Sequence, residues 1–199
     1  MEIQKENAKP EPEAIMTQQN SPHDPNPTDE LKINDLIAAL GDPSIDTRHK
    51  AVRELKEYGK PAVSPLITAL ADSPDNDRRW YAAVALFQIG EPAIDPLLSA
   101  MRVNHEKDFR RYAAAALGNI GAPAVEPLID AMGSDDADLR GYLSRALCRI
   151  GKPAVGPLTQ RLDHADDLIK SCASLTLWQM GETGIPAMVE KIQADEEKS

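Results

Sequence analysis

A string of the form Gly-x-Pro-Ala-(Val/Ile)-x-Pro-Leu occurs four times in this chain at nearly even spacing. The copies begin at Gly59, Gly90, Gly121 and Gly151, and a degraded fifth copy, GETGIPAMV, begins at Gly181. The successive intervals are 31, 31, 30 and 30 residues. A fixed period of this length is typical of proteins that stack one structural unit, each unit contacting mainly its neighbours.

The residues around each copy have the spacing of two helices. Ala or Leu stands eight residues before the repeat glycine, Leu stands four before it and an apolar residue one before it, which places all three on one helical face. Glycine can end this first helix, and the proline that follows suits the first turn of a second helix. We expect an aspartate to cap each first helix, namely Asp46, Asp77, Asp108, Asp138 and, one residue out of register, Asp167.

The pattern predicts an all-α fold, an α-solenoid of stacked antiparallel helix pairs. A half-unit opens at Leu31, and five full units follow at about 46–72, 77–103, 108–134, 138–164 and 167–195. Residues 1–30 differ in composition, with seven acidic and two basic side chains and several prolines. We therefore predict a disordered acidic Pro-rich tail at 1–28, a single solenoid domain at 29–195 and a charged C-terminal end at 196–199.

Charge and hydropathy exclude several classes of partner. The net charge is −10, without the basic excess of a nucleic-acid-binding protein. No apolar run approaches the ~20 residues that span a bilayer, and the N-terminal stretch lacks an apolar signal segment. Two cysteines are too few for a disulfide scaffold. We expect a cytoplasmic protein with reduced thiols that binds neither nucleic acid nor membrane.

The unit resembles the short HEAT-like repeat of the PBS lyase (phycobilisome lyase) family over residues 31 to about 195. The resemblance is carried by the Asp-x-Arg starts (DTR, DRR, DFR, DLR), by the Ala-Leu stretches YAAVALFQIG and YAAAALGNIG, and by the AVxPLI second helix. Related repeats occur in stand-alone scaffolds, bilin lyase subunits and deoxyhypusine hydroxylase. The resemblance implies a structural ladder of polar contacts between repeats and turn aspartates, formed by Arg48, Arg79, Arg110, Arg140 and Lys170.

The chain lacks the residues that the catalytic relatives would need. The hydroxylase holds a di-iron centre with several His-Glu pairs, whereas this chain has one such pair, His105-Glu106, in a turn. We therefore expect no metal site and no cofactor. Cys148 and Cys172 fall on first helices, where free cysteine is usually a buried small residue. No acid, base and nucleophile form a set, so we expect no enzyme activity.

Two surfaces are candidate contact sites. On the second helices, the side opposite the core carries Asp95, Glu126, Asp130, Asp163 and Glu190. In HEAT-type stacks these helices line a concave surface and lie ~8–10 Å apart, so the row predicts a binding groove for a basic or polar partner segment. The alternative is a solvated polar face that keeps an acidic protein soluble.

The second surface lies on the convex side of the unit at 77–103. Trp80, Val84 and Phe87 have i, i+4, i+7 spacing and point away from the core positions, which predicts an exposed apolar contact patch. The alternatives are cover by the N-terminal tail or a helix rotation that buries the three side chains.

These observations favour a non-catalytic protein-interaction scaffold that binds a protein partner through the concave surface. The alternative is an auxiliary subunit of a bilin-lyase-like or other protein-modifying complex. A third reading is a hydroxylase relative that has lost its metal site. The sequence names neither the partner, the pathway nor the oligomeric state.

Overall fold

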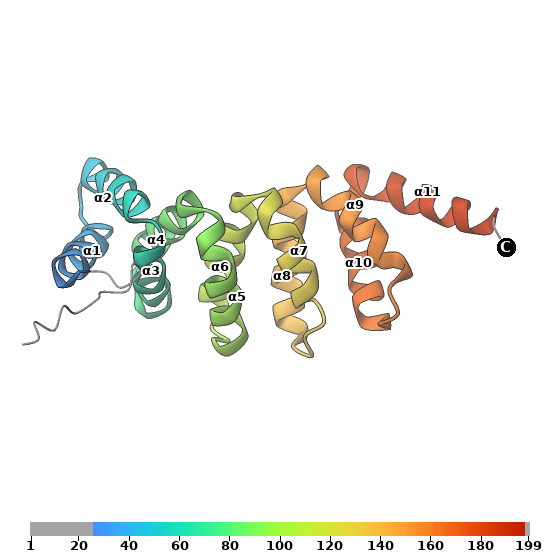
Figure 1. The fold of residues 1–199 in the computed structure, drawn as a ribbon, viewed down its shortest axis with the longest axis horizontal. Coiled ribbons are helices and arrows are strands. Elements are labelled where there is room, and N and C mark those ends of the chain that lie inside the picture. The colour runs from blue at the N-terminus through green and yellow to red at the C-terminus, as the bar shows by residue number, and fades with distance from the viewer. Residues whose placement is uncertain (1–25, 198–199) are drawn as a thin grey trace, which may run out of the picture.

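The computed structural model describes residues 26–197. The predicted tail at 1–28 therefore lies outside the described residues except for its last three, and Pro27 and Thr28 already belong to the first helix. The described residues contain helices and no strand, as the repeat pattern predicts. Figure 1 shows the helices stacked side by side in a nearly straight row.

The helices form one half-unit and five pairs (Figure 1). The half-unit is α1 (Pro27–Ala39). First helices are α2 (Ile45–Tyr58), α4 (Asn76–Ile89), α6 (Lys107–Ile120), α8 (Ala137–Ile150) and α10 (Asp167–Gln179). Second helices are α3 (Lys60–Asp72), α5 (Ile94–Val103), α7 (Val125–Ala131), α9 (Lys152–Gln160) and α11 (Ile185–Glu196). Short 3-10 turns are η1 (Glu91–Ala93), η2 (Ala122–Ala124), η3 (Arg161–Asp163) and η4 (Gly181–Thr183).

The N-caps of the first helices lie two residues before the predicted capping aspartates, or one residue before for α10. The N-caps are Ser44, Asp75, Glu106, Asp136 and Asp166, and each side chain accepts a backbone N–H of the first turn. The predicted capping aspartates lie inside the first turn instead. There the carboxylates face the positive end of the helix dipole, which also favours a negative charge.

The repeat glycines end the first helices as expected. Gly59, Gly90, Gly121 and Gly151 have φ between 63° and 86°, the left-handed region in which a Cβ is strained. In the second and third full units a 3-10 turn follows, and the α-helix begins only after the Ala of the repeat string. This late start places the second proline of the string within the first helical turn, where its missing N–H costs least.

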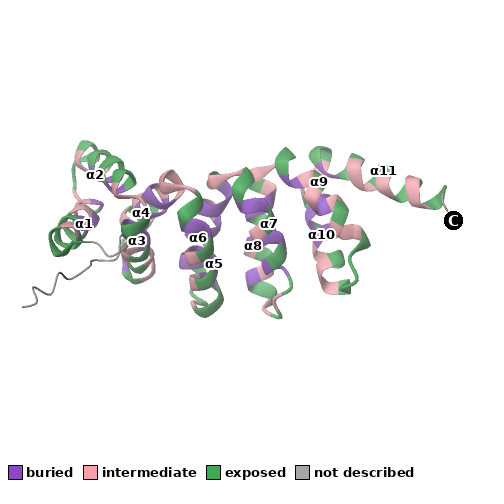
Figure 2. Ribbon diagram, viewed as in Figure 1, coloured by how far each residue is buried: buried purple, intermediate pink, exposed green. Residues whose placement is uncertain are grey.

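The core is a continuous column of leucines shared between units. Each is fully buried: Leu55, Leu66, Leu86, Leu97, Leu117, Leu128, Leu147, Leu158 and Leu177. Figure 2 shows the buried residues along the inner sides of the stacked pairs. Because each pair buries its apolar face against the next pair, the outward residues of both helices are not needed to form the core.

Candidate protein-interaction surface

The third predicted ladder residue, Arg110, links its own unit to the next one. Arg110 on α6 is 2% exposed. Its Nε donates to the carbonyl oxygens of Met101 and Asn104, at 3.0 and 2.9 Å, and its Nη2 donates to Oδ2 of Asp136 at 2.7 Å. Asp136 also caps α8 by accepting the N–H of Leu139. One carboxylate therefore caps a helix and binds the preceding unit.

Both roles of Asp136 affect the pKa of its carboxyl group. The guanidinium of Arg110 and the backbone N–H of Leu139 both bind the ionised carboxylate, and they hold its pKa well below the ordinary value. The ring Nδ1 of His105 lies 2.9 Å from Nη2 of Arg110, so the single His-Glu motif contributes its histidine to a structural link between repeats.

Two further rungs of the ladder form, in more exposed surroundings. Nη1 of Arg48 donates to Oδ2 of Asp77 at 3.2 Å. Nη1 of Arg79 donates to Oε2 of Glu106 at 3.1 Å, while its Nε donates to the carbonyl oxygen of Ser73 at 2.6 Å. The acceptor in each case lies at the start of the next first helix.

The last two predicted ladder residues differ. Arg140 donates to the carbonyl oxygen of Ser134 in its own turn at 2.7 Å and approaches the thiol of Cys172, but no carboxylate of the next unit pairs with it among the described residues. Lys170 is exposed, and the described part of the chain offers its amine no ion pair. Lys170 lies on α10, and no first helix follows it among the described residues.

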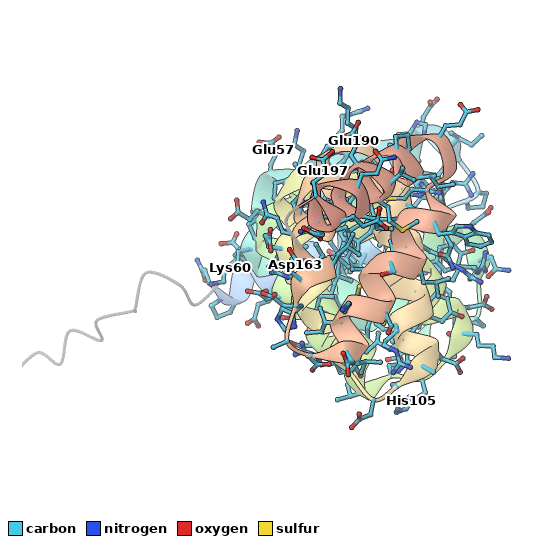
Figure 3. All side chains as sticks on the ribbon, turned by 90° about the vertical axis from the view of Figure 1, so that its right-hand side faces the viewer. Glu57, Lys60, His105, Asp163, Glu190 and Glu197 are labelled. Carbon is cyan, nitrogen blue, oxygen red and sulfur yellow. The ribbon has the colours of Figure 1, made fainter. Side chains whose placement is uncertain are left out.

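The acidic row on the second helices is exposed throughout, from Asp95 through Glu126, Asp130 and Asp163 to Glu190. In Figure 3, which looks along the stack from its C-terminal end, Glu190 lies above Asp163 on the helix that points toward the viewer. The row follows successive units: Asp95 lies on α5, Glu126 and Asp130 lie on α7, Asp163 lies in η3, and Glu190 lies on α11. We call the outward side of α1, α3, α5, α7 and α9, with η3, the helix B face.

Two cations pair with the acidic row, and the repeat pattern did not predict either of them. Nη2 of Arg161 lies 2.8 Å from Oε2 of Glu126 and 3.2 Å from Oδ1 of Asp130. Nζ of Lys191 lies 2.6 Å from Oδ2 of Asp163, and hydrogen bonds to Asp163 and Asp195 raise the pKa of that amine. The acidic row is therefore partly neutralised. The sequence places both cations near row members, Arg161 two residues before Asp163 and Lys191 next to Glu190, but it does not show which carboxylates they reach.

The helix B face is hollowed at its N-terminal end. A groove of about 590 Å³ lies between α1 and α3 and is lined by Asn34, Ser64, Thr68, Asp72 and Arg78, among others. A second hollow of about 520 Å³ is lined by Lys60, Glu91, Pro92, Asp95 and Pro96. The helix B face is thus grooved as well as charged.

The predicted apolar patch on α4 is smaller than the spacing implied. Trp80 is exposed, but Val84 and Phe87 are half-buried and pack against the core. Trp80 and Val84 line a hollow of about 380 Å³ together with His49, Arg53 and Tyr81. The indole is therefore the main exposed part, because Val84 and Phe87 pack against the core.

The described residues hold no cluster of three or more His, Cys, Asp or Glu that could bind a metal ion. Burial raises the pKa of the Cys148 and Cys172 thiols, so neither is a ready thiolate at neutral pH. Within the described residues, no helix is long and apolar enough to cross a membrane.

Comparison with known proteins fits the repeat geometry. Residues 33–118 and 94–177 match the family described as HEAT repeats. The chain belongs to the HEAT repeat family. No curated protein matches it.

Three solved structures resemble this HEAT repeat protein. One is an engineered protein, with 20% identity over 82% of this chain and 86% of that chain, at a TM-score of 0.33. Another is the complex of CpcE and CpcF of phycocyanin lyase from Nostoc sp. PCC7120, with 23% identity over 74% of this chain and 98% of that chain, at a TM-score of 0.41. A third is a de novo designed 16-helix transmembrane nanopore, with 14% identity over 82% of this chain and 54% of that chain, at a TM-score of 0.23.

Proposed function

We propose that this HEAT repeat protein is a non-catalytic scaffold that binds a basic, extended segment of a protein partner along the helix B face. The observation that carries the proposal is the row of exposed carboxylates on successive units, Asp95, Glu126, Asp130 and Asp163. Solenoids use their repeated outward positions as extended binding surfaces, and complementary charge steers such encounters.

The spacing of the row predicts how far apart the basic residues of the partner segment lie. Neighbouring helices of a stack lie ~8–10 Å apart, and an extended chain advances about 3.3 Å per residue. An extended segment crossing the units therefore meets a new second helix about every three residues. We expect Lys or Arg at i, i+3 and i+6, opposite Asp95, the pair Glu126 and Asp130, and Asp163.

Arg161 and Lys191 set the strength of this interaction. Arg161 already bridges Glu126 and Asp130, and Lys191 already binds Asp163. A partner cation would share these carboxylates with a resident one. Exposed pairs of this kind contribute little each and are screened by salt, so the proposal predicts a weak complex with a strong dependence on ionic strength.

The test uses a fluorescein-labelled 12-residue peptide with Arg at every third position. Its anisotropy is titrated with the full chain at low and at physiological salt. Replacing Glu126→Gln together with Asp130→Asn removes two carboxylates and frees the Arg161 guanidinium to repel the peptide. At about 0.5 kcal/mol or more per charge, we expect affinity to fall at least roughly 5-fold, with little change in thermal stability.

The matched control removes two exposed carboxylates elsewhere, by Glu54→Gln with Glu57→Gln on α2. Both double variants have the same net charge, so this control should bind the Arg peptide like the unaltered chain. If the two variants lost affinity equally, binding would follow net charge alone, and the helix B face would have no special part in it. A peptide with Gln in place of each Arg should not bind.

A further inference from the structure

The last two helices expose an unusual amount of apolar surface. Among the described residues, the large exposed apolar side chains outside this region are scattered singly over the other units. Those of the last unit gather at one end of the stack: Leu175 and Trp178 on α10, and Ile185, Val189 and Ile192 on α11. We call these five residues the open end. Clustered apolar surface of this kind marks a contact site more often than single exposed residues do.

The repeat itself shows that the α11 positions are interface positions. Counted from the repeat glycine, Ile185, Val189 and Ile192 correspond to Val125, Ile129 and Met132 of the third full unit. The third-unit residues are at most 3% exposed, whereas the three on α11 are between 37% and 51% exposed. No residue of α11 is buried. In Figure 1 α11 runs outward along the long axis instead of returning beside α10.

Trp178 also occupies a position that faces the next unit. It stands three residues before its repeat glycine, as Gly118 and Cys148 do in earlier units. A Cβ at Gly118 would meet the Arg149 side chain of the following unit, and the thiol of Cys148 approaches the Thr176 carbonyl of the following unit. Trp178 is 62% exposed at the corresponding place, where no further unit among the described residues covers it.

The opposite end of the stack, at α1, exposes mainly polar side chains. Ile33 and Ile37 on α1, and Leu40 at its C-cap, point inward and are buried. The exposed residues of α1 are mostly polar, including Lys32 and Asp35, and Leu31 is the single large apolar side chain among them. Solenoids need terminal units with a polar outer face, and α1 provides one. Head-to-tail stacking of two copies would therefore set an apolar end against a polar one.

The charge around the open end decides between a second copy and a different protein. Residues 182–199 carry five acidic side chains against two lysines, and one of these, Lys191, is already bound to Asp163 and Asp195. Two copies joined at their open ends would bring these acidic segments together, which opposes association. A partner with basic residues around an apolar face would meet complementary charge.

We propose that the open end docks a helix of another protein, one with an apolar face flanked by Lys and Arg, which continues the helical stack. This site is distinct from the helix B face and does not depend on it. Its core would be the Trp178 indole and the α11 stripe, since buried aromatic anchors carry much of the energy of such interfaces.

The test titrates the full chain with synthetic 18-residue helical peptides that share one leucine face and differ in their flanking residues, either Lys and Arg or Glu. The readout is the emission of Trp178 in a Trp80→Phe background, because Trp80 is the second tryptophan and is also exposed. We expect a blue shift and binding with the basic-flanked peptide, and at least 10-fold weaker binding with the Glu-flanked peptide. Val189→Glu with Ile192→Glu should weaken binding of the basic-flanked peptide at least 10-fold.

The matched control is Ile45→Glu with Trp80→Glu, which adds the same two charges at exposed apolar positions on first helices, away from both the helix B face and the open end, and leaves Trp178 as the single tryptophan. This control should bind the basic-flanked peptide like the unaltered chain, and circular dichroism and thermal melts should show both double variants folded. Equal binding of the two peptides, or equal loss in both double variants, would overturn the proposal. A dimer in analytical ultracentrifugation that Val189→Glu with Ile192→Glu abolishes would overturn it too, in favour of a second copy.

Discussion

Arg110 should be the most costly rung of the ladder to remove. Arg110→Met keeps an unbranched apolar stem but deletes the guanidinium, which leaves the carbonyls of Met101 and Asn104 and the carboxylate of Asp136 without their donor. The two carbonyl bonds are worth about 1 kcal/mol each and the charge-assisted bond about 2 kcal/mol. We expect a loss of about 4 kcal/mol in the free energy of unfolding, or roughly 10 °C in Tm for a chain of this size.

The assay is urea unfolding followed by circular dichroism at 222 nm and by tryptophan emission. Trp80 and Trp178 lie on opposite sides of the Arg110 link. Single-tryptophan backgrounds should therefore report separate midpoints in the Arg110→Met chain, because a weakened junction lets parts of a solenoid unfold independently.

Arg48→Met is the matched control for this prediction. It removes the same group from a rung whose carboxylate, Asp77, is 71% exposed. An ion pair in that setting is worth at most about 1 kcal/mol. Equal losses from the two variants, or a loss below about 1 kcal/mol for Arg110→Met, would refute the reasoning that burial makes this rung strong.

Two further predictions concern pH and backbone packing. Because the pKa of Asp136 is lowered in the folded state, its stabilising contribution is present above its ordinary pKa of about 3.9 and is lost as the pH falls below it, so Asp136→Asn should flatten the decline of Tm between pH 5 and 2. Gly184→Ala would press a Cβ into the backbone of Leu177 and should cost about 2 kcal/mol in a denaturant melt, whereas Gly118→Ala meets only the movable Arg149 side chain and should cost clearly less.

The repeat period was enough to predict the helices and their core. Gly59 and its counterparts end the first helices because glycine alone adopts positive φ cheaply, and the recurring leucines are buried because their spacing puts them on one face. Cap positions were misplaced by one or two residues. A run such as Asp-Asn-Asp offers several capping side chains close together, and local sequence does not choose between them.

The candidate surfaces depended more on tertiary contacts. Arg161 and Lys191 reach carboxylates on neighbouring elements, and the half-burial of Val84 and Phe87 comes from packing against the core. Such relations join residues that are distant in the chain, so no single-unit pattern reveals them. The first three ladder arginines each contact a carboxylate at the start of the next first helix, but the acceptors differ in position: Asp77 lies inside the first turn, whereas Glu106 and Asp136 are N-caps.

What the sequence by itself determined is the part of the fold that repeats: helix, glycine stop, second helix and the shared leucine column, all of which follow from local backbone preference and apolar spacing. Only the tertiary structure showed which apolar residues are exposed at the end of the stack and which carboxylates are paired with Arg161 and Lys191. Ile185, Val189 and Ile192 occupy core positions in the repeat yet lie exposed, because burial in a stack requires a neighbour and the last unit has none among the described residues.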